Sequence, residues 1–105
     1  MDERESEEVG KLKQKMKKVF KYPVDITDLQ YVMMPKDAEI LTVQTQGEKE
    51  ELYIWALVDP ELENQKRMIM IVGTGHEIHE TNIKFIDTFQ IFHGKGVFHV
   101  FEVMK

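Results

Sequence analysis

The stretch E-L-Y-I-W-A-L-V-D, residues 51–59, is the most hydrophobic part of the chain, and it decides the expected fold. Side chains point alternately to the two faces of a strand, and here both sets are apolar: Leu52, Ile54, Ala56 and Val58 against Tyr53, Trp55 and Leu57. Because a strand with two apolar faces needs cover on both, the pattern predicts a strand in the centre of a sheet.

Other apolar runs, separated by turn residues, flank this stretch in both directions. The expected strands are residues 19–24, 30–34, 39–46, 51–59, 67–72, 83–92 and 97–103. In the run at 39–46, alternation puts Leu41 and Val43 together on an apolar face. The clearest hairpin signal is H-G-K-G at 93–96, because its glycines allow positive φ between two strands.

Short strands in this number predict a mainly β domain, a small antiparallel β-sandwich or barrel of about six or seven strands. An α+β fold stays open, since the polar residues 77–82 also suit one helical turn. The length of 105 residues predicts one globular domain, at 19–105, after a charged leader at 1–18 that is flexible or helical.

Composition excludes several classes of chemistry. The chain has no cysteine, which rules out disulfides, thiolate catalysis and cysteine-ligated zinc or iron–sulfur sites. Its one serine, Ser6, lies in the leader, so we expect no serine-nucleophile hydrolase. No apolar run is long enough to cross a bilayer, and the start lacks a signal-peptide pattern, so we expect an intracellular protein without membrane contact.

The net charge of −5 is unevenly distributed. Six lysines and no acid lie between residues 11 and 21, whereas residues 23–105 carry a net charge of −7. The lysines suit a patch for nucleic acid or phosphate-bearing ligands, or else a solvated helical leader in which Glu7 pairs with Lys11. Because the folded body is acidic, we do not expect a nucleic-acid partner.

The most site-like motif is G-T-G-H at residues 73–76. Gly73 and Gly75 allow close approach of the backbone to a ligand and can aim N–H groups at an anion, while Thr74 and His76 add donors. The motif lacks the length and the lysine of a phosphate-binding P-loop. The alternative is a tight turn between two strands.

Histidines suggest two further hypotheses. His99 is either a histidine at the edge of the core or converges with His76 on a shared ligand. The cluster around His76 and His79 does not have the H-E-x-x-H spacing, and a metal site there needs His93 or His99 to complete it, so we expect neither a metal nor a cofactor. No spacing singles out an acid–base pair among the carboxylates, so we do not predict an enzyme.

Trp55 and Tyr53 share one face of the central strand and are either core residues or a platform on which a base stacks. If they form a platform, Gln44 on the preceding strand supplies hydrogen-bond selectivity. Arg67, at the start of an apolar strand, is one of the cations able to neutralise a phosphate.

Six ordered blocks carry a family resemblance: K-Y-P (21–23), I-T-D (26–28), M-P-K-x-A-x-I-L-x-V-Q (34–44), W-A-L-V-D-P (55–60), G-T-G-H (73–76) and V-F-H-V-F-E (97–102). Together they make the chain resemble, over about residues 19–102, a family of small uncharacterised proteins of bacteriophages and prophages. The resemblance implies a phage or prophage origin and expression in the cytoplasm of a bacterial host. It brings no catalytic residue with it.

These observations predict a non-enzymatic phage accessory protein that sequesters a host nucleotide immune signal, such as a cyclic dinucleotide. The expected ligand contacts are Gly73, Thr74, Gly75, His76, His99, Trp55, Tyr53, Arg67 and Gln44. The alternatives are a protein-interaction module that inhibits a host protein, and a small enzyme acting on a phosphate or glycosidic bond. We also expect a homo-oligomer, in the first place a dimer.

Overall fold

Residues 16–104 are described by the computed structural model, which folds them into seven strands with no helix among them. The strands are β1 (Lys18–Pro23), β2 (Leu29–Pro35), β3 (Glu39–Gln46), β4 (Glu51–Val58), β5 (Asn64–Gly73), β6 (Ile83–Ile91) and β7 (Gly96–Val103). The mainly β prediction is therefore confirmed. Most of the predicted leader, residues 1–15, lies outside the described residues, and β1 begins one residue before the predicted domain start.

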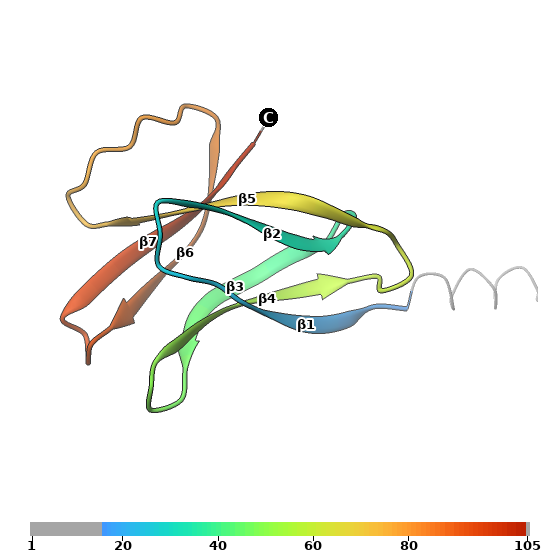
Figure 1. Cartoon of the computed structure of the whole chain (residues 1–105), viewed down its shortest axis with the longest axis horizontal. Coiled ribbons are helices and arrows are strands. Elements are labelled where there is room, and N and C mark those ends of the chain that lie inside the picture. Colours follow the sequence, from blue (N-terminus) through green and yellow to red (C-terminus); the bar gives the residue numbers. More distant parts are fainter. Residues whose placement is uncertain (1–15, 105) are drawn as a thin grey trace, which may run out of the picture.

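Two antiparallel sheets make up the fold (Figure 1). The first has three strands in the order β1-β4-β3, and the second has four in the order β2-β5-β7-β6. The predicted sandwich is correct and the predicted barrel is not, because in the described part of the chain the two sheets do not close into one. β4 is central in its sheet, as its sequence predicts.

The core lies between the two sheets and takes one face from each strand. Its fully buried side chains include Ile54 and Val58 of β4, and Ile69, Phe89 and Val100 of the opposite sheet. The other face of β4 is half-exposed rather than covered, which corrects one expectation. A two-layer sandwich has only one interior, so side chains on the outer face of a central strand stay partly in solvent.

The crossover from β5 to β6 contains no helical turn, so the helical alternative for residues 77–82 is wrong. β5 ends opposite Phe98 and β6 begins opposite Val103, which obliges the connection to travel back along β7. That path is about 17 Å along the strand. The nine residues 74–82 have ample length to cover this path in the irregular conformation that they adopt.

Two β-bulges change which side chains face the core. The β3 register shifts between Ile40 and Thr42, so Ile40 packs against the core while Leu41 is 48% exposed. The prediction that Leu41 shares an apolar face with Val43 is therefore wrong, because the extra residue of a bulge reverses the alternation. A second bulge in β6 lies between Phe85 and Asp87.

Asp87 joins the two sheets where β3 and β6 lie side by side. Its carboxylate accepts hydrogen bonds from the Thr42 hydroxyl at 2.5 Å, the Val43 N–H at 3.0 Å and the Gln44 amide at 3.2 Å. Burial alone would raise the pKa of Asp87, but these bonds, together with one from the Thr88 N–H, outweigh it and lower the pKa. One side of the sandwich is thus closed by a charged side chain.

The predicted hairpin between β6 and β7 is confirmed, but its loop is residues 92–95 rather than 93–96, because Ile91 pairs with Gly96. The Lys95 N–H donates to the Phe92 carbonyl at 3.1 Å, and Phe92, His93 and Gly94 all have positive φ. The described residues contain no helix that could cross a membrane.

Candidate functional site

The predicted ligand residues fall in three separate places. Gln44, Tyr53 and Trp55 lie on the outer face of the three-stranded sheet. The G-T-G-H loop follows the last residues of β5, next to His99 of β7 in the four-stranded sheet. Arg67 lines a cavity near the start of β5. None of the pockets described in residues 16–104 is lined by residues from all three places.

The outer face of the three-stranded sheet carries an aromatic pair. Tyr53 and Trp55 project from the same side of β4 with ring centroids 5.7 Å apart and ring planes at 64°. Lys21 of β1 lies opposite Trp55 in the register, and its ammonium is 4.3 Å from the centroid of the Tyr53 ring. Lys21 also donates to the Gln46 side-chain oxygen at 2.9 Å. We call Lys21, Gln44, Gln46, Tyr53 and Trp55 the aromatic face.

Polar groups hold this face in place. The Tyr53 hydroxyl donates to Glu51 at 2.7 Å; this bond, followed by burial and the negative charge of Glu51, raises the pKa of Tyr53. The Gln44 amide nitrogen donates to the Thr88 carbonyl at 3.3 Å as well as to Asp87. Gln44 therefore contributes to the joint between the sheets, and its amide oxygen is the group left to meet a ligand.

The G-T-G-H loop and His99 do come together, through a threonine. The Thr74 hydroxyl lies 2.7 Å from His99 Nε2, and the Thr88 hydroxyl lies 3.0 Å from His99 Nδ1. The loop is a tight turn, in which the His76 N–H donates to the Gly73 carbonyl at 3.1 Å and Gly75 has a φ of +88°. The turn therefore places Thr74 over His99.

Thr88 was missed by the sequence reasoning. Counting back from the predicted turn at 93–96 would pair His99 with Gln90. The loop of the structure lies one residue earlier, with Ile91 opposite Gly96, and this register brings Thr88 opposite His99. A hydroxyl on each ring nitrogen orients the imidazole, since a hydroxyl can donate to one nitrogen and accept from the other.

His76 does not contact His99; its ring packs over Gly73, and it lines a hollow of about 320 Å³ between the crossover and the strands β2 and β5. Met70 and Val72 form the apolar part of this hollow. Three carboxylates, those of Asp28, Glu77 and Glu80, also line it. Their negative charge opposes a phosphate-bearing ligand here.

The hypothesis of a metal site gains no support from the geometry. Within residues 16–104, no three His, Cys, Asp or Glu side chains converge as a metal site requires. His79 lies 3.4 Å from Glu77, but both side chains are almost fully exposed.

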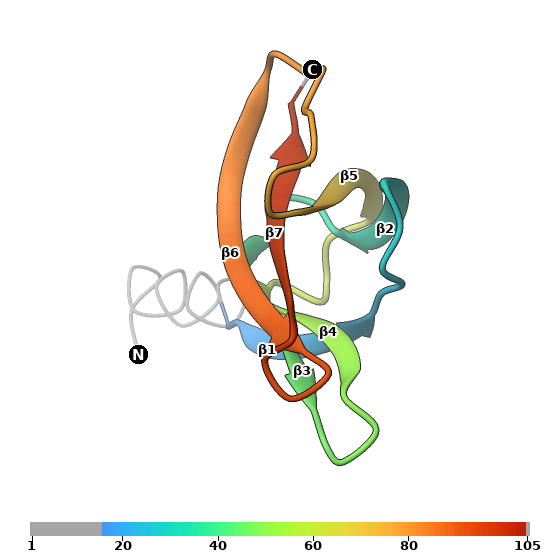
Figure 2. The same ribbon diagram turned by 90° about the vertical axis from the view of Figure 1, so that its left-hand side faces the viewer.

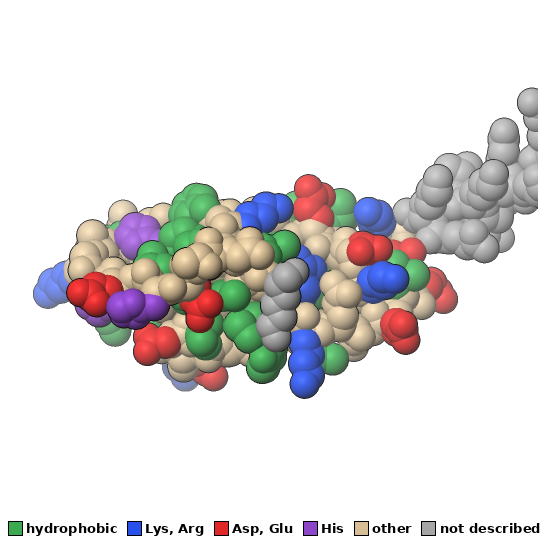
Figure 3. Space-filling view, turned by 90° about the horizontal axis from the view of Figure 1, so that it is seen from above, with side chains coloured by type: hydrophobic (Ala, Val, Ile, Leu, Met, Phe, Trp, Pro, Cys, Tyr) green, Lys and Arg blue, Asp and Glu red, His purple; other side chains and the backbone are tan. Residues whose placement is uncertain are grey.

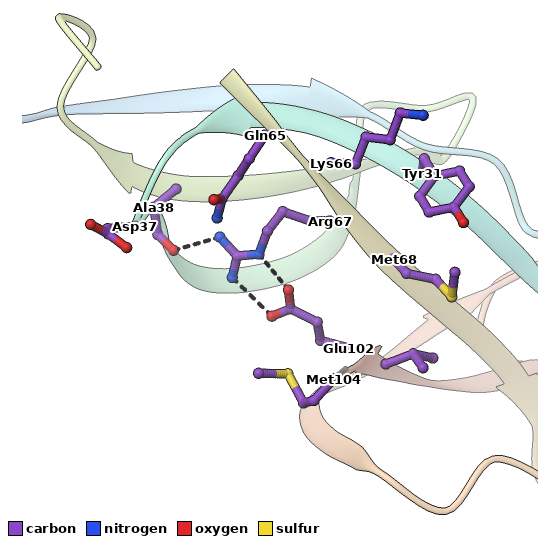
Figure 4. Close-up of a pocket in the computed structure, with 10 residues that line it drawn as sticks. Tyr31, Asp37, Ala38, Gln65, Lys66, Arg67, Met68, Glu102 and Met104 are labelled. Carbon is purple, nitrogen blue, oxygen red and sulfur yellow. Dashed lines mark hydrogen bonds and ion pairs between the residues drawn. The ribbon is translucent and has the colours of Figure 1, made fainter. Parts of the chain in front are cut away.

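Arg67 lies in the wall of the largest described cavity, which measures about 650 Å³ (Figure 4). Its guanidinium forms a two-bond ion pair with Glu102, one bond being Nη2 to Oε1 at 2.8 Å, and it donates to the Ala38 carbonyl at 2.8 Å. The bond to Glu102 raises the pKa of Arg67 further above its usual value. Because Glu102 balances its charge, Arg67 is engaged in holding β5, β7 and the 35–39 turn together.

Fold and surface together describe a small β-sandwich with an aromatic outer face. The chain belongs to the family defined by a domain of unknown function, DUF7352, which matches residues 16–105. The expected resemblance to an uncharacterised family thus holds at that level, and the match begins two residues before β1. No curated protein and no solved structure matches the chain at a significant level.

Proposed function

We propose that this protein is a non-catalytic binding protein whose aromatic face holds a nucleotide. The observation that supports this best is the pairing of Tyr53 with Trp55 on a half-exposed sheet face, with the Lys21 ammonium beside them. Stacking of a base on an exposed aromatic ring contributes about 1 to 3 kcal/mol per base. Lys21 supplies a positive charge for a phosphate.

Charge favours the aromatic face over the G-T-G-H loop as the place for a phosphate. The hollow beside the loop is lined by three carboxylates, whereas β1 starts at Lys18 and carries Lys21. The chain segment that leads into β1 is the lysine-rich part of the sequence. An anionic ligand is therefore drawn toward the β1 side of the sandwich.

The ligand we propose in particular is a cyclic dinucleotide that serves as an immune signal in a bacterial host. Such a molecule has two bases and two phosphates, and the aromatic face offers two rings at different angles and a lysine. The phage or prophage origin implied by the sequence resemblance supplies the biological reason, since sequestering this signal blunts a host defence in the bacterial cytoplasm.

Calorimetry and the fluorescence of Trp55, the one tryptophan of the chain, test this proposal. We expect cyclic dinucleotides to bind at micromolar concentration, to quench Trp55 and to be recovered intact after denaturation. Trp55→Ala should weaken binding by roughly 5- to 150-fold, the equivalent of one lost stacking contact. Lys21→Ala should weaken it too, without removing the aromatic pair.

The matched control is Phe85→Ala, which removes an exposed aromatic ring from the other sheet and should leave affinity unchanged. An absence of heat and quenching at micromolar ligand would contradict the nucleotide proposal. Equal loss of affinity in the Phe85 variant would place the ligand elsewhere. Cleaved ligand after incubation would favour the enzyme alternative instead.

A second candidate function is inhibition of a host protein. The outer face of the four-stranded sheet favours it, since Phe85 is 56% exposed there and hydrophobic side chains gather over the middle of this side of the molecule (Figure 3). Apolar patches on a soluble protein often mark interaction sites. A pulldown from host lysate separates the two: a stoichiometric host protein that Phe85→Ala releases and Trp55→Ala retains supports this alternative.

A further inference from the structure

Strand β2, with the sequence L-Q-Y-V-M-M-P, is an edge strand, and no strand within residues 16–104 pairs with its open side. It pairs with β5 on one side, and Figure 2 shows it at the outer margin of its sheet. Proteins usually guard such edges with charges, prolines or bulges. The other edge strands have such guards: β1 has Lys18, Lys21 and Pro23, and β3 and β6 cover each other through Asp87. In contrast, β2 has no charged residue, no bulge and a proline only at its last position.

The pairing with β5 determines which backbone groups of β2 face outward. The Ile71 N–H donates to the Asp28 carbonyl at 3.3 Å, so residues 28, 30, 32 and 34 direct their backbone groups toward β5. Antiparallel alternation turns the N–H and C=O of Leu29, Tyr31 and Met33 to the open edge. The Leu29 carbonyl accepts a bond from the Thr27 hydroxyl at 3.3 Å, which agrees with this direction.

We propose that two copies of this chain pair through β2, antiparallel about a twofold axis that passes between their Val32 residues. In this register Tyr31 of each copy lies opposite Met33 of the other, and the two exchange N–H to C=O bonds in both directions. Leu29 lies opposite Pro35. Six backbone hydrogen bonds then join the copies into one eight-stranded sheet.

In this register the residue that lacks a backbone N–H lies opposite a carbonyl that already has a hydrogen-bond donor. Pro35 has no N–H to give, and it lies opposite Leu29, whose carbonyl already has Thr27 as its partner. Shifting the register by one pair would place Tyr31 opposite itself and aim the Met33 N–H at that occupied carbonyl. The Val32-centred register therefore leaves no outward backbone donor of β2 unmatched.

Side chains and charge also favour a second copy as the occupant. Tyr31 and Met33 are 54% and 47% exposed, and the pairing turns them into cross-strand neighbours, an arrangement in which sulfur and aromatic ring attract. Each chain carries a net charge of −5, so two copies repel across most of their surfaces. β2 itself carries no acid, and the nearby charge is the Lys66 ammonium, 5.3 Å from the centroid of the Tyr31 ring, so two copies can meet at this edge without bringing acids together.

Charge reversal tests the proposal with the full chain. Wild type should sediment, over a concentration series, toward twice the 12.4 kDa of one chain. The double substitution Tyr31→Glu/Met33→Glu sets like charges opposite each other and should halve that mass, as should Tyr31→Lys/Met33→Lys. Mixing the two variants should restore the doubled mass, because residue 31 of one copy then meets an opposite charge at residue 33 of the other.

Phe85→Glu is the matched control, since it places an acid on the same sheet away from β2 and should leave the mass doubled. A wild type of single-chain mass throughout the series overturns the proposal. The proposal is also overturned if both double variants, Tyr31→Glu/Met33→Glu and Tyr31→Lys/Met33→Lys, keep the doubled mass. It is overturned as well if only Phe85→Glu abolishes the doubled mass, since the copies would then meet through the face of the sheet.

A cysteine placed at the axis tests the register without altering charge. The chain has no cysteine of its own, so Val32→Cys introduces a single thiol per copy. Directly opposed residues of a non-hydrogen-bonded pair have Cα atoms about 4.5 Å apart, within disulfide range. We expect mild oxidation to give nearly complete covalent dimer with Val32→Cys and little with Leu41→Cys, at an exposed position of β3. Val32 is 7% exposed in the single chain, so the mass of the reduced variant is measured first. Equal cross-linking of the two variants, or none with a Val32→Cys protein that sediments at the doubled mass, overturns the register.

Discussion

The backbone N–H of Val43 on β3 donates a 3.0 Å hydrogen bond to the carboxylate of Asp87 on β6, so a single side chain joins strands of different sheets. The bulges at Leu41 and Ile86 lie beside this joint. Bulges bend strands and re-aim side chains. The two irregularities therefore bring the edge of one sheet to the carboxylate of the other.

Replacement of Asp87 by Asn should destabilise the fold. The negative charge on the oxygen that accepts from Thr42, Val43 and Gln44 is lost, and an Asn amide has no second oxygen to accept from the Thr88 N–H. Hydrogen bonds to charged groups are worth about 1.5 to 3 kcal/mol, so we expect a loss of that order in urea unfolding. Glu39→Gln, at an exposed acid on β3, should change stability by less than about 0.5 kcal/mol. An unchanged midpoint for Asp87→Asn would show that the joint is dispensable.

The same carboxylate should make stability depend on acidity. Its pKa is lowered in the folded protein from the ordinary value of 3.8, so its contribution is complete above that value and is lost as pH falls through the folded value. Wild type and Asp87→Asn should therefore differ most near neutral pH and converge in acid. Urea midpoints measured for both proteins across the acid range check this. A constant difference at all pH values would contradict the lowered pKa.

Removal of one partner from the Arg67–Glu102 pair should be costly. Both side chains are largely buried, at 15% and 9% exposure, so Glu102→Ala leaves a guanidinium that keeps only the Ala38 carbonyl and the weaker attraction of Asp37. Breaking a buried pair in this way costs about 3 to 5 kcal/mol. The double variant Arg67→Met/Glu102→Leu should be more stable than Glu102→Ala, since no charge remains. Thermal unfolding of wild type, Glu102→Ala and the double variant tests this order of stability. Equal losses of stability in the single and double variants would argue against a penalty for the buried charge.

Truncation of two neighbouring residues of β3 should lower the free energy of unfolding by very different amounts. Ile40 packs on the core, so Ile40→Ala should cost about 2 kcal/mol or more, whereas exposed Leu41 should lose less than about 0.5 kcal/mol on the same change. Simple alternation along the strand predicts the reverse order. Denaturant unfolding of both variants distinguishes the bulged strand from a regular one, and a larger loss at Leu41 would contradict the bulge.

Local patterns were sufficient for most of the strands. Residues 39–46 and 51–59 have the right composition and alternation, and the strands found there match within a residue. The glycines at 94 and 96 indicate the hairpin between β6 and β7, although Phe92 and His93 also have positive φ in its loop. These features depend on neighbours in the chain, which is why the sequence reveals them. The prediction of which side chains face the core was wrong at Leu41, where a bulge adds a residue. Alternation along one strand cannot reveal a bulge, because a bulge is defined by the pairing with the neighbouring strand.

The candidate site shows the same division. The sequence by itself placed Tyr53 beside Trp55 on one face of a central strand, since this follows from spacing, and it left open whether Gly73 to His76 form a ligand loop or a tight turn. Only the tertiary structure decided that the aromatic face stays half-exposed, that Thr74 reaches His99, and that Glu102 takes the charge of Arg67. Each of these depends on which strands become neighbours across long stretches of chain, and that choice is made by burial of a shared core rather than by any local pattern.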